Sequence, residues 1–234
     1  MVEPRRSRTL DVKRTLSFLA AALEGAGVCP VAYGQLDMLA RFLAELERFQ
    51  PHLRLVSELN SEGIALLLLE GLAVGNRLET NARVLDIGPG GGFPGIPMAI
   101  LRTDASFVLV ERRRRIATYL EHVAQTLGLK HVQVLCVEFE KAPSSGELGH
   151  VQEITAKAVW SWQEYVRNVL PLVEKGARAW VFGTPCLSDE AIVKFLKSMG
   201  VGNVSVSSID ARLLEASPTR RLFALSLSGT QKQG

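Results

Sequence analysis

The segment "DIGPGGGFPGIP", residues 86–97, holds five glycines and three prolines in twelve positions. Neither a helix nor a strand tolerates that density, because glycine loosens the backbone and proline lacks an N–H donor. The segment is therefore predicted to be a loop. It follows "RVL" (83–85), which predicts a strand, and precedes "MAIL" (98–101), which predicts a helix. A glycine-rich turn between a strand and a helix is typical of parallel sheets that bind a ligand at that turn.

The period of the apolar residues divides the chain. From about residue 10 to 78 the pattern is helical, with Leu36, Leu39, Leu43 and Leu46 recurring on one helical face. From residue 83 onward, strand-like and helix-like segments alternate, which predicts parallel strands with helices on both faces. We expect strands near 83–87, 106–110, 132–137, 154–159, 178–183, 203–208 and 221–227.

This order predicts an α/β fold with a Rossmann-like, seven-stranded and mostly parallel sheet. Residues 1–78 are predicted to form a helical extension packed on a main domain of residues 79–234. The connection "IDARLLEASPTR" (209–220) is too short and irregular for a crossover helix, so the last strand is predicted to be antiparallel.

The glycines allow two cofactor interpretations. Gly90, Gly92 and Gly95 spell the dinucleotide fingerprint G-x-G-x-x-G, but that fingerprint begins directly at the strand end, where Gly88 stands instead. From the strand onward, the pattern is Asp86-x-Gly88-x-Gly90-x-Gly92, which looks like motif I of the S-adenosylmethionine (SAM) methyltransferases. The register of the loop favours SAM over NAD, and these four residues are predicted to bind it.

A second acid supports an adenosine cofactor. Glu111 ends "SFVLVE", at the expected tip of the second strand, where an acid accepts hydrogen bonds from ribose hydroxyls. Dinucleotide enzymes use an acid there too, so Glu111 does not choose between the two cofactors.

A longer sequence match distinguishes between SAM and NAD. "LDIGPGGGFPGIPMAI" resembles the loop of the glucose-inhibited division protein B family, the small-subunit (16S) ribosomal RNA guanine-N7 methyltransferases, and "GFPGIP" is its most distinctive part. The likeness continues through "LVERRRRIATYL", "VEFE" and "TRRLFALSL", and covers most of residues 36–228. It implies a SAM-dependent rRNA methyltransferase. Gly88, Phe93, Val137 and Glu138 match cofactor-binding positions, and Lys157 stands at a family arginine that would serve cofactor binding and catalysis.

The chain also departs from the family pattern. Arg54 replaces an asparagine, Leu67 a histidine, and Glu70-Gly71 an Asp-Ser pair. Lys157 keeps the charge of arginine but not its planar fork. These changes leave the fold and the cofactor better supported than the methylated target.

Guanine N7 suits a chain with few catalytic signatures. This nitrogen has a free lone pair and no proton, so methyl transfer needs no general base and rests on positioning and electrostatics. We find no Asn/Asp-Pro-Pro-aromatic motif after the fourth strand, and no cysteine there to attack a pyrimidine.

Arginine clusters are the candidate RNA contacts. Cations at the start of a helix oppose its dipole, and nearby phosphates would explain their gathering after the second strand. A solvated turn whose arginines pair with surface acids explains them as well. The candidates are Arg112, Arg113, Arg114, Arg115, Arg220 and Arg221. Trp160 and Trp162 form either an aromatic wall for a base or part of the core.

Composition limits the cellular compartment and the binding partners that we expect. A net charge of +3 leaves any contact with RNA to local clusters. Three scattered cysteines favour a reducing compartment and no metal site, and no apolar run approaches the roughly 20 residues of a membrane span. We therefore expect a cytoplasmic monomer with rRNA as partner. A methyltransferase of a small molecule or protein, and a SAM-binding relative with an eroded target site, remain alternatives.

Overall fold

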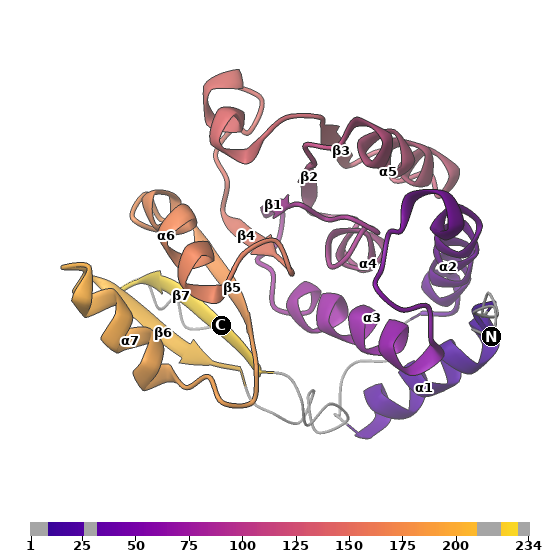
Figure 1. Cartoon of the computed structure of the whole chain (residues 1–234), viewed down its shortest axis with the longest axis horizontal. Helices are drawn as coiled ribbons and strands as arrows, with labels where there is room; N and C mark the ends of the chain where they lie inside the picture. The colour runs from indigo at the N-terminus through magenta and orange to yellow at the C-terminus, as the bar shows by residue number, and fades with distance from the viewer. Residues whose placement is uncertain (1–8, 26–31, 210–220, 229–234) are drawn as a thin grey trace, which may run out of the picture.

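The computed structural model of the chain describes residues 9–25, 32–209 and 221–228. Its centre is a seven-stranded sheet in the order β3-β2-β1-β4-β5-β7-β6. The strands are β1 (Arg83–Ile87), β2 (Ser106–Val110), β3 (Val132–Leu135), β4 (Glu153–Ala156), β5 (Arg178–Gly183), β6 (Val204–Ser208) and β7 (Arg221–Leu227). Figure 1 shows the sheet running through the middle of the molecule.

Seven α-helices and one 3-10 helix accompany the strands in the described part of the chain. They are α1 (Val12–Gly25), α2 (Tyr33–Leu53), α3 (Ser61–Gly75), α4 (Gly95–Leu101), α5 (Arg114–Thr126), η1 (Phe139–Ser145), α6 (Trp162–Val173) and α7 (Asp189–Ser198). None of these helices combines the length and apolar character needed to cross a membrane.

The strand directions agree with the sequence pattern. β1 pairs in parallel with β2 and β4, β2 with β3, and β4 with β5. β7 is antiparallel to both β5 and β6, which confirms the expectation for the last strand. The connection before it, residues 210–220, lies outside the described residues, as does Arg220.

Two strands end earlier than the sequence pattern predicts. β3 stops at Leu135, before the expected end at 137, and β4 stops at Ala156, before the expected end at 159. Beyond β4 the backbone turns sharply, because Ala158 has a φ of 57° and extended strands need negative φ. The residues after Ala156 therefore leave the sheet at the carboxyl end of β4.

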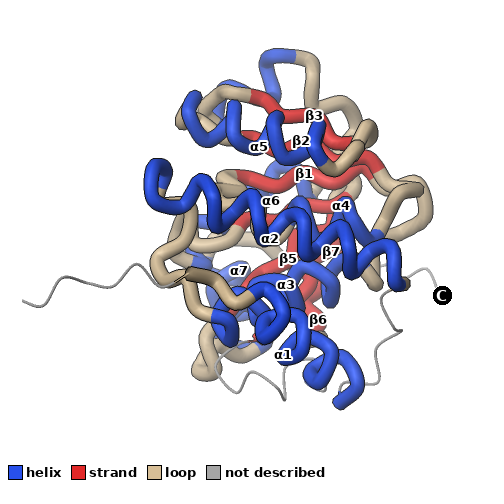
Figure 2. Tube along the Cα trace, turned by 90° about the vertical axis from the view of Figure 1, so that its right-hand side faces the viewer, coloured by secondary structure: helices blue, strands red, loops and turns tan. Residues whose placement is uncertain are grey.

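Each face of the sheet carries its own core. Val84, Phe107 and Trp180 point to the face covered by α1–α5, whereas Leu85 and Val108 point to the face covered by α6 and α7. This alternation follows from the two-residue period of a strand. Figure 2 shows α1, α2, α3 and α5 lying in front of the strands.

The N-terminal helices belong to the first of these cores. α3 is buried from Leu68 to Gly75, as expected for a helix that is apolar on nearly every side. Its N-terminus is capped by Asn60, whose Oδ1 accepts the Gly63 N–H at 2.7 Å. Leu39 and Phe42 of α2 are fully buried in the same cluster as Ile96 of α4. α2 and α3 thus lie directly behind the loop that follows β1, and α1 packs against these two helices.

Candidate cofactor site

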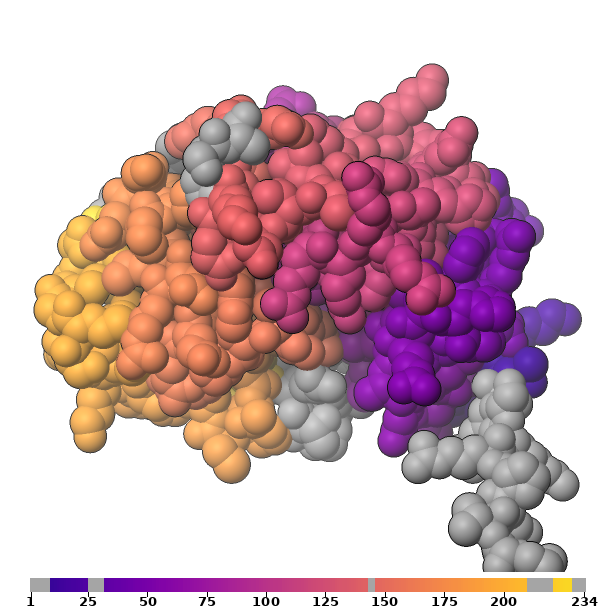
Figure 3. Space-filling model, turned by 45° about the horizontal axis from the view of Figure 1, so that its top comes forward, coloured from indigo at the N-terminus to yellow at the C-terminus, as the bar shows by residue number. Residues whose placement is uncertain are grey.

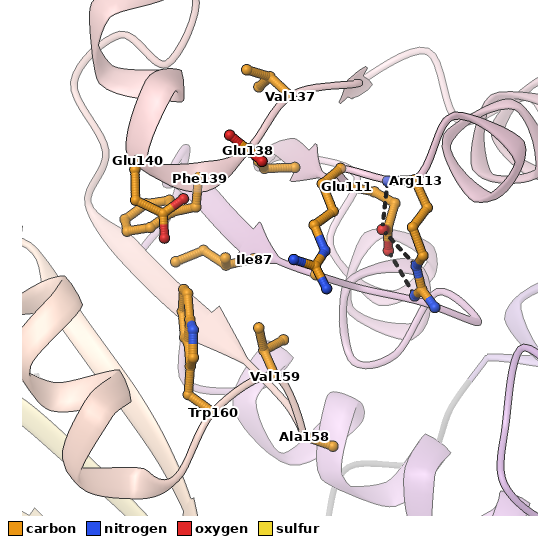
Figure 4. Close-up of a pocket in the computed structure, with 13 residues that line it drawn as sticks. Ile87, Glu111, Arg113, Val137, Glu138, Phe139, Glu140, Ala158, Val159 and Trp160 are labelled. Atoms are coloured by element: carbon orange, nitrogen blue, oxygen red, sulfur yellow. Dashed lines mark hydrogen bonds and ion pairs between the residues drawn. The ribbon is translucent and has the colours of Figure 1, made fainter.

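A cavity of about 610 Å³ opens at the carboxyl ends of the parallel strands. Ile87 is level with Val110 and Ala156, and Val110 is level with Leu135, so the residues that follow all four strands meet at one edge. The volume suits a small-molecule ligand. The lining residues are Ile87, Gly88, Val110, Glu111, Arg112, Arg113, Val137, Glu138, Phe139, Glu140, Ala158, Val159 and Trp160. Figure 4 shows how they surround the space, and Figure 3 shows the magenta segment after β2 adjoining the salmon and orange segments after β3 and β4.

Gly88 begins the loop and lies on the cavity. Its φ of 63° is in the left-handed region that favours glycine, and its N–H donates to the Val110 carbonyl at 2.8 Å. A Cβ at this position would lie 2.5 Å from Val159 Cγ2. Gly88 is therefore required both by the turn and by the close approach of the segment that follows β4.

Asp86 lies behind the loop and not on the cavity. Its side chain is fully buried, its Oδ2 accepts the Gly95 N–H at 2.8 Å, and its Oδ1 accepts the Thr155 hydroxyl at 3.1 Å. Burial raises the pKa of Asp86 to about 7, against the lowering effect of these two hydrogen bonds, and nearby Glu111 raises it further. In this structure Asp86 shapes the loop from within.

Glu111 is the buried acid of the cavity. It follows β2 with only 2% of its surface exposed, and its carboxylate accepts from the backbone N–H of Arg113 at 3.0 Å. The Arg113 guanidinium adds Nε–Oε1 at 3.0 Å and Nη2–Oε2 at 3.2 Å. The Glu111 carboxylate is thus held in a fixed orientation at the strand end, where it can accept hydroxyl hydrogens.

The opposite wall comes from the segment after β3. Val137 and Glu138 line the cavity, as the resemblance implies, and Glu138 is exposed. A hydrogen bond from Lys141 lowers the pKa of Glu138. Glu138 therefore offers an ionised acceptor near the cavity mouth.

Other predicted cofactor residues face away from this cavity. Phe93 is 5% exposed and its ring lies 5.2 Å from that of Phe42 in α2. The glycines beside it also face α2: a Cβ on Gly91 would lie 3.2 Å from Leu46 Cδ1, and one on Gly92 would lie 3.2 Å from Phe42 Cε2. These residues shape the loop from the side of α2. Gly90 is not among the lining residues either, and a Cβ there would lie 3.8 Å from the Leu55 carbonyl oxygen and 3.9 Å from Arg113 Nη2.

Lys157 also differs from its predicted place. It is not among the cavity residues, and its Nζ lies 3.3 Å from Glu70 Oε2 in α3. Its side chain is only 10% exposed. The side chain that the resemblance assigned to the cofactor and to catalysis is turned toward the N-terminal helices instead.

The arginine cluster divides between two places. Arg112 and Arg113 line the cavity, while Arg114 and Arg115 are exposed in the first turn of α5 beside it. Arg221 is exposed where β7 pairs with the end of β5, on the same edge of the sheet.

Sequence reasoning missed part of the wall. Ala158 and Val159 line the cavity after β4, and Phe139 begins η1 with its ring 5.8 Å from that of Trp160. Trp160 thus lies in the aromatic wall that was one of its two interpretations. The predicted strand order could have indicated these cavity residues, because the residues that follow each parallel strand lie at the ligand-binding edge of the sheet.

The chemistry of the lining is that of binding rather than of covalent catalysis. Among the described residues that line the cavity, none is a serine, cysteine or histidine. The described residues also contain no group of three His, Cys, Asp or Glu side chains that could hold a metal ion. Buried and exposed carboxylates, an aromatic side chain and an open glycine backbone fit a nucleoside-containing ligand.

Solved structures show the fold to which this chain is similar. A putative O-methyltransferase from Klebsiella pneumoniae superposes with a TM-score of 0.53 at 16% identity, covering 89% of this chain and 95% of that one. The O-methyltransferase TomG from Streptomyces achromogenes, solved in complex with SAM, gives 0.52 at 18% identity, covering 98% and 100%. A SAM-dependent methyltransferase from Aquifex aeolicus gives 0.51 at 16%, covering 69% and 92%. The chain has the Rossmann-like fold of the SAM-dependent methyltransferases.

The family follows from sequence. Residues 35–211 match the family described as rRNA small subunit methyltransferase G, GidB. The chain is 32% identical over 160 residues to ribosomal RNA small subunit methyltransferase G of Chromobacterium violaceum, covering 68% of this chain and 71% of that protein. It is 31% identical over 148 residues to the protein of that name from Corynebacterium efficiens, covering 62% of this chain and 64% of the relative's length. The chain belongs to the GidB family, which confirms the resemblance stated above.

Proposed function

We propose that this chain transfers a methyl group from SAM to N7 of a guanine in small-subunit ribosomal RNA. The observation that carries the proposal is the match of residues 35–211 to the family, since this region contains every residue that lines the cavity. The names of the relatives in Chromobacterium violaceum and Corynebacterium efficiens point to the same substrate class.

The lining residues fit the cofactor. Glu111 would accept the ribose hydroxyls, and the Arg113 guanidinium, 56% exposed, can shift while keeping one contact to the carboxylate. Gly88 offers a backbone that a ligand can approach, and Val137 and Glu138 flank the far side. SAM, when bound, supplies a methyl group already activated by the sulfonium.

The protein's own contribution is positioning. Guanine N7 needs no proton removed, and the cavity accordingly presents carboxylates, arginines and apolar walls rather than a nucleophile with a base. Ile87, Val159 and Trp160 supply apolar surface to the lining. The chain's residues therefore bind and orient the two reactants, and positioning carries the catalysis.

The substrate is tested by label transfer. The purified chain is incubated with tritiated SAM and, in separate arms, small ribosomal subunits, naked rRNA or protein extract. N7-methylguanosine is then located by aniline cleavage after mild reduction. We expect tritium at one guanine of the small-subunit RNA. The aniline cleavage at that guanine should be absent from the rRNA of a strain that lacks the gene. Label in the protein arm alone, or unchanged cleavage in the deletion strain, contradicts the assignment.

Glu111→Gln tests the cofactor site. The amide keeps the shape but accepts fewer hydrogen bonds, so we expect SAM affinity measured by calorimetry to fall about tenfold, the worth of one charge-assisted hydrogen bond. Asp104→Asn is the matched control, because Asp104 also pairs with an arginine, Arg102 at 2.7 Å, but just before β2, at the other end of that strand. Equal affinities in the two variants contradict the role of Glu111.

The RNA contacts are tested by salt dependence. Replacing Arg114 and Arg115 with alanine should weaken binding to any RNA and reduce the slope of log K against log salt by about one for each lost phosphate contact. Replacing Lys194 and Lys197, exposed on α7, is the control with the same change of charge. Equal slopes in both double variants favour the interpretation of a solvated arginine turn.

A further inference from the structure

A buried ion pair joins the N-terminal helices to the end of β4. Glu70 in α3 is 4% exposed and Lys157, the first residue after β4, is 10% exposed at the side chain, with Lys157 Nζ 3.3 Å from Glu70 Oε2. Taking two charges out of water costs free energy that their attraction only partly returns, and apolar pairs of similar size often serve stability as well. The pair is therefore better explained by a requirement for position than by stability alone.

The three residues after Lys157 form one wall of the cavity. We call Ala158–Trp160 the strap. Ala158 has a φ of 57°, a conformation that costs a residue with a side chain about 1 kcal/mol and persists only when its surroundings impose it. Val159 is 39% exposed and faces the cavity, although most large apolar side chains in the described residues are covered. Lys157 is the residue directly before this strained turn.

The other side of the strap is held by packing. The Trp160 ring lies 5.8 Å from that of Phe139, and Val159 lies so close to Gly88 that a Cβ there would meet Val159 Cγ2 at 2.5 Å. Figure 4 shows Val159 and Trp160 below Ile87, with Glu138 above it. A shift of the strap by a few tenths of an ångström would therefore change the space over the glycine loop.

We propose that Glu70 and Lys157 are positioning residues, whose ion pair fixes the strap and thereby the shape of the cofactor cavity. This inference rests on the proposed function, because it assigns the pair a task in binding and aligning the reactants. It also explains two departures from the family pattern as one exchange. Aspartate is one methylene shorter than glutamate, and arginine carries one more atom along its chain than lysine, so Asp with Arg spans the same gap as Glu with Lys.

The first experiment removes the cation. Lys157→Met keeps an unbranched side chain that ends where the lysine Cε lies, and it removes the ammonium group of this ion pair. We expect the Kd for SAM, measured by calorimetry, to rise about tenfold, and kcat with small-subunit rRNA to fall further than KM changes. Arg178→Met is the matched control, because Arg178 pairs with buried Glu153 at the opposite end of β4, with Nε–Oε2 at 3.0 Å. It should lower Tm at least as much while leaving SAM affinity within about twofold.

The second experiment restores the pair with other residues. Glu70→Asp and Lys157→Arg each alter the span, and each should weaken SAM binding, while the double variant should recover most of it. Because both single variants keep their charges, they test the inference even where Lys157→Met does not fold.

The outcomes separate this inference from the proposed function. A wild-type chain that binds SAM but does not methylate rRNA refutes the substrate and leaves the positioning role measurable by calorimetry. Wild-type SAM affinity in Lys157→Met, or losses in the double variant equal to the sum of the single ones, overturns the inference while the methyltransferase assignment stands.

Discussion

The pKa of Asp86 makes the stability of this protein depend on pH in an unusual direction. Burial raises that pKa from 3.8 to about 7, so the native state binds the proton more tightly than the unfolded state does. The resulting stabilisation is fully present below pH 3.8 and is lost as pH rises through about 7. At about 1.4 kcal/mol per pH unit, the shift of about three units corresponds to about 4 kcal/mol over the whole range.

Asp86→Asn removes this titration and keeps the hydrogen bonds. The amide oxygen can accept the Gly95 N–H, and the amide nitrogen can donate to the Thr155 hydroxyl, which itself lies 3.5 Å from the Leu85 carbonyl. We therefore expect the ligand-free variant to gain stability relative to wild type as pH rises. Between pH 5 and pH 8 the difference in unfolding free energy should change by about 2 to 3 kcal/mol in favour of the variant.

The assay is urea denaturation followed by circular dichroism at half-unit steps of pH. Every other group titrates in both proteins, so the difference between the two curves isolates Asp86. A difference that stays constant from pH 5 to pH 8 refutes the reasoning, because it would mean that Asp86 is ionised throughout this range in the native state and that its hydrogen bonds offset the effect of burial on its pKa.

Three further substitutions test the packing around the site and the helix that supports it. Gly95→Ala places a Cβ 2.5 Å from Asp86 Oδ2, and we expect a loss of at least about 2 kcal/mol by urea denaturation, whereas an unchanged midpoint would show that the loop relaxes freely. Asn60→Ala removes the side-chain acceptor at the start of α3 and should cost about 1 kcal/mol, measured as a fall in Tm. Trp180→Phe leaves Glu153 without the indole N–H at 2.8 Å and should cost about 1 to 3 kcal/mol; a neutral result would mean that water or Arg178 replaces the bond.

The strands and the glycine loop were predictable because their signals are local. The two-residue period of a strand places Val84 and Leu85 on opposite faces, and the density of glycine and proline predicts the loop between Ile87 and Gly95. The predicted loop, residues 86–97, was too long at both ends, because β1 includes Asp86 and Ile87 and α4 begins at Gly95. The direction of β7 followed from the length of its connection. These features depend on residues that are neighbours in the chain.

The orientation of site residues was harder to predict, because it depends on residues far apart in the chain. Asp86 was assigned to the cofactor from its place in a motif, yet it shares the face of Val84 and points behind the loop. Strand parity alone would have predicted this. Lys157 turns toward Glu70, and Ala158 adopts a left-handed conformation, for which the local sequence carries no signal. Motif position led to Glu111, Val137 and Glu138, which line the cavity, but gave no sign that Asp86 and Lys157 point elsewhere.

The contact between the glycine loop and α2 has a genetic consequence. Phe42 and Leu46 lie against Phe93 and the positions of Gly91 and Gly92, so the shape of the loop depends on a helix that contributes no residue to the cavity lining. A screen for loss-of-function alleles should therefore recover substitutions in α2 as well as in the loop. Second-site suppressors of such alleles are expected across this contact, with a smaller side chain in one partner compensating a larger one in the other.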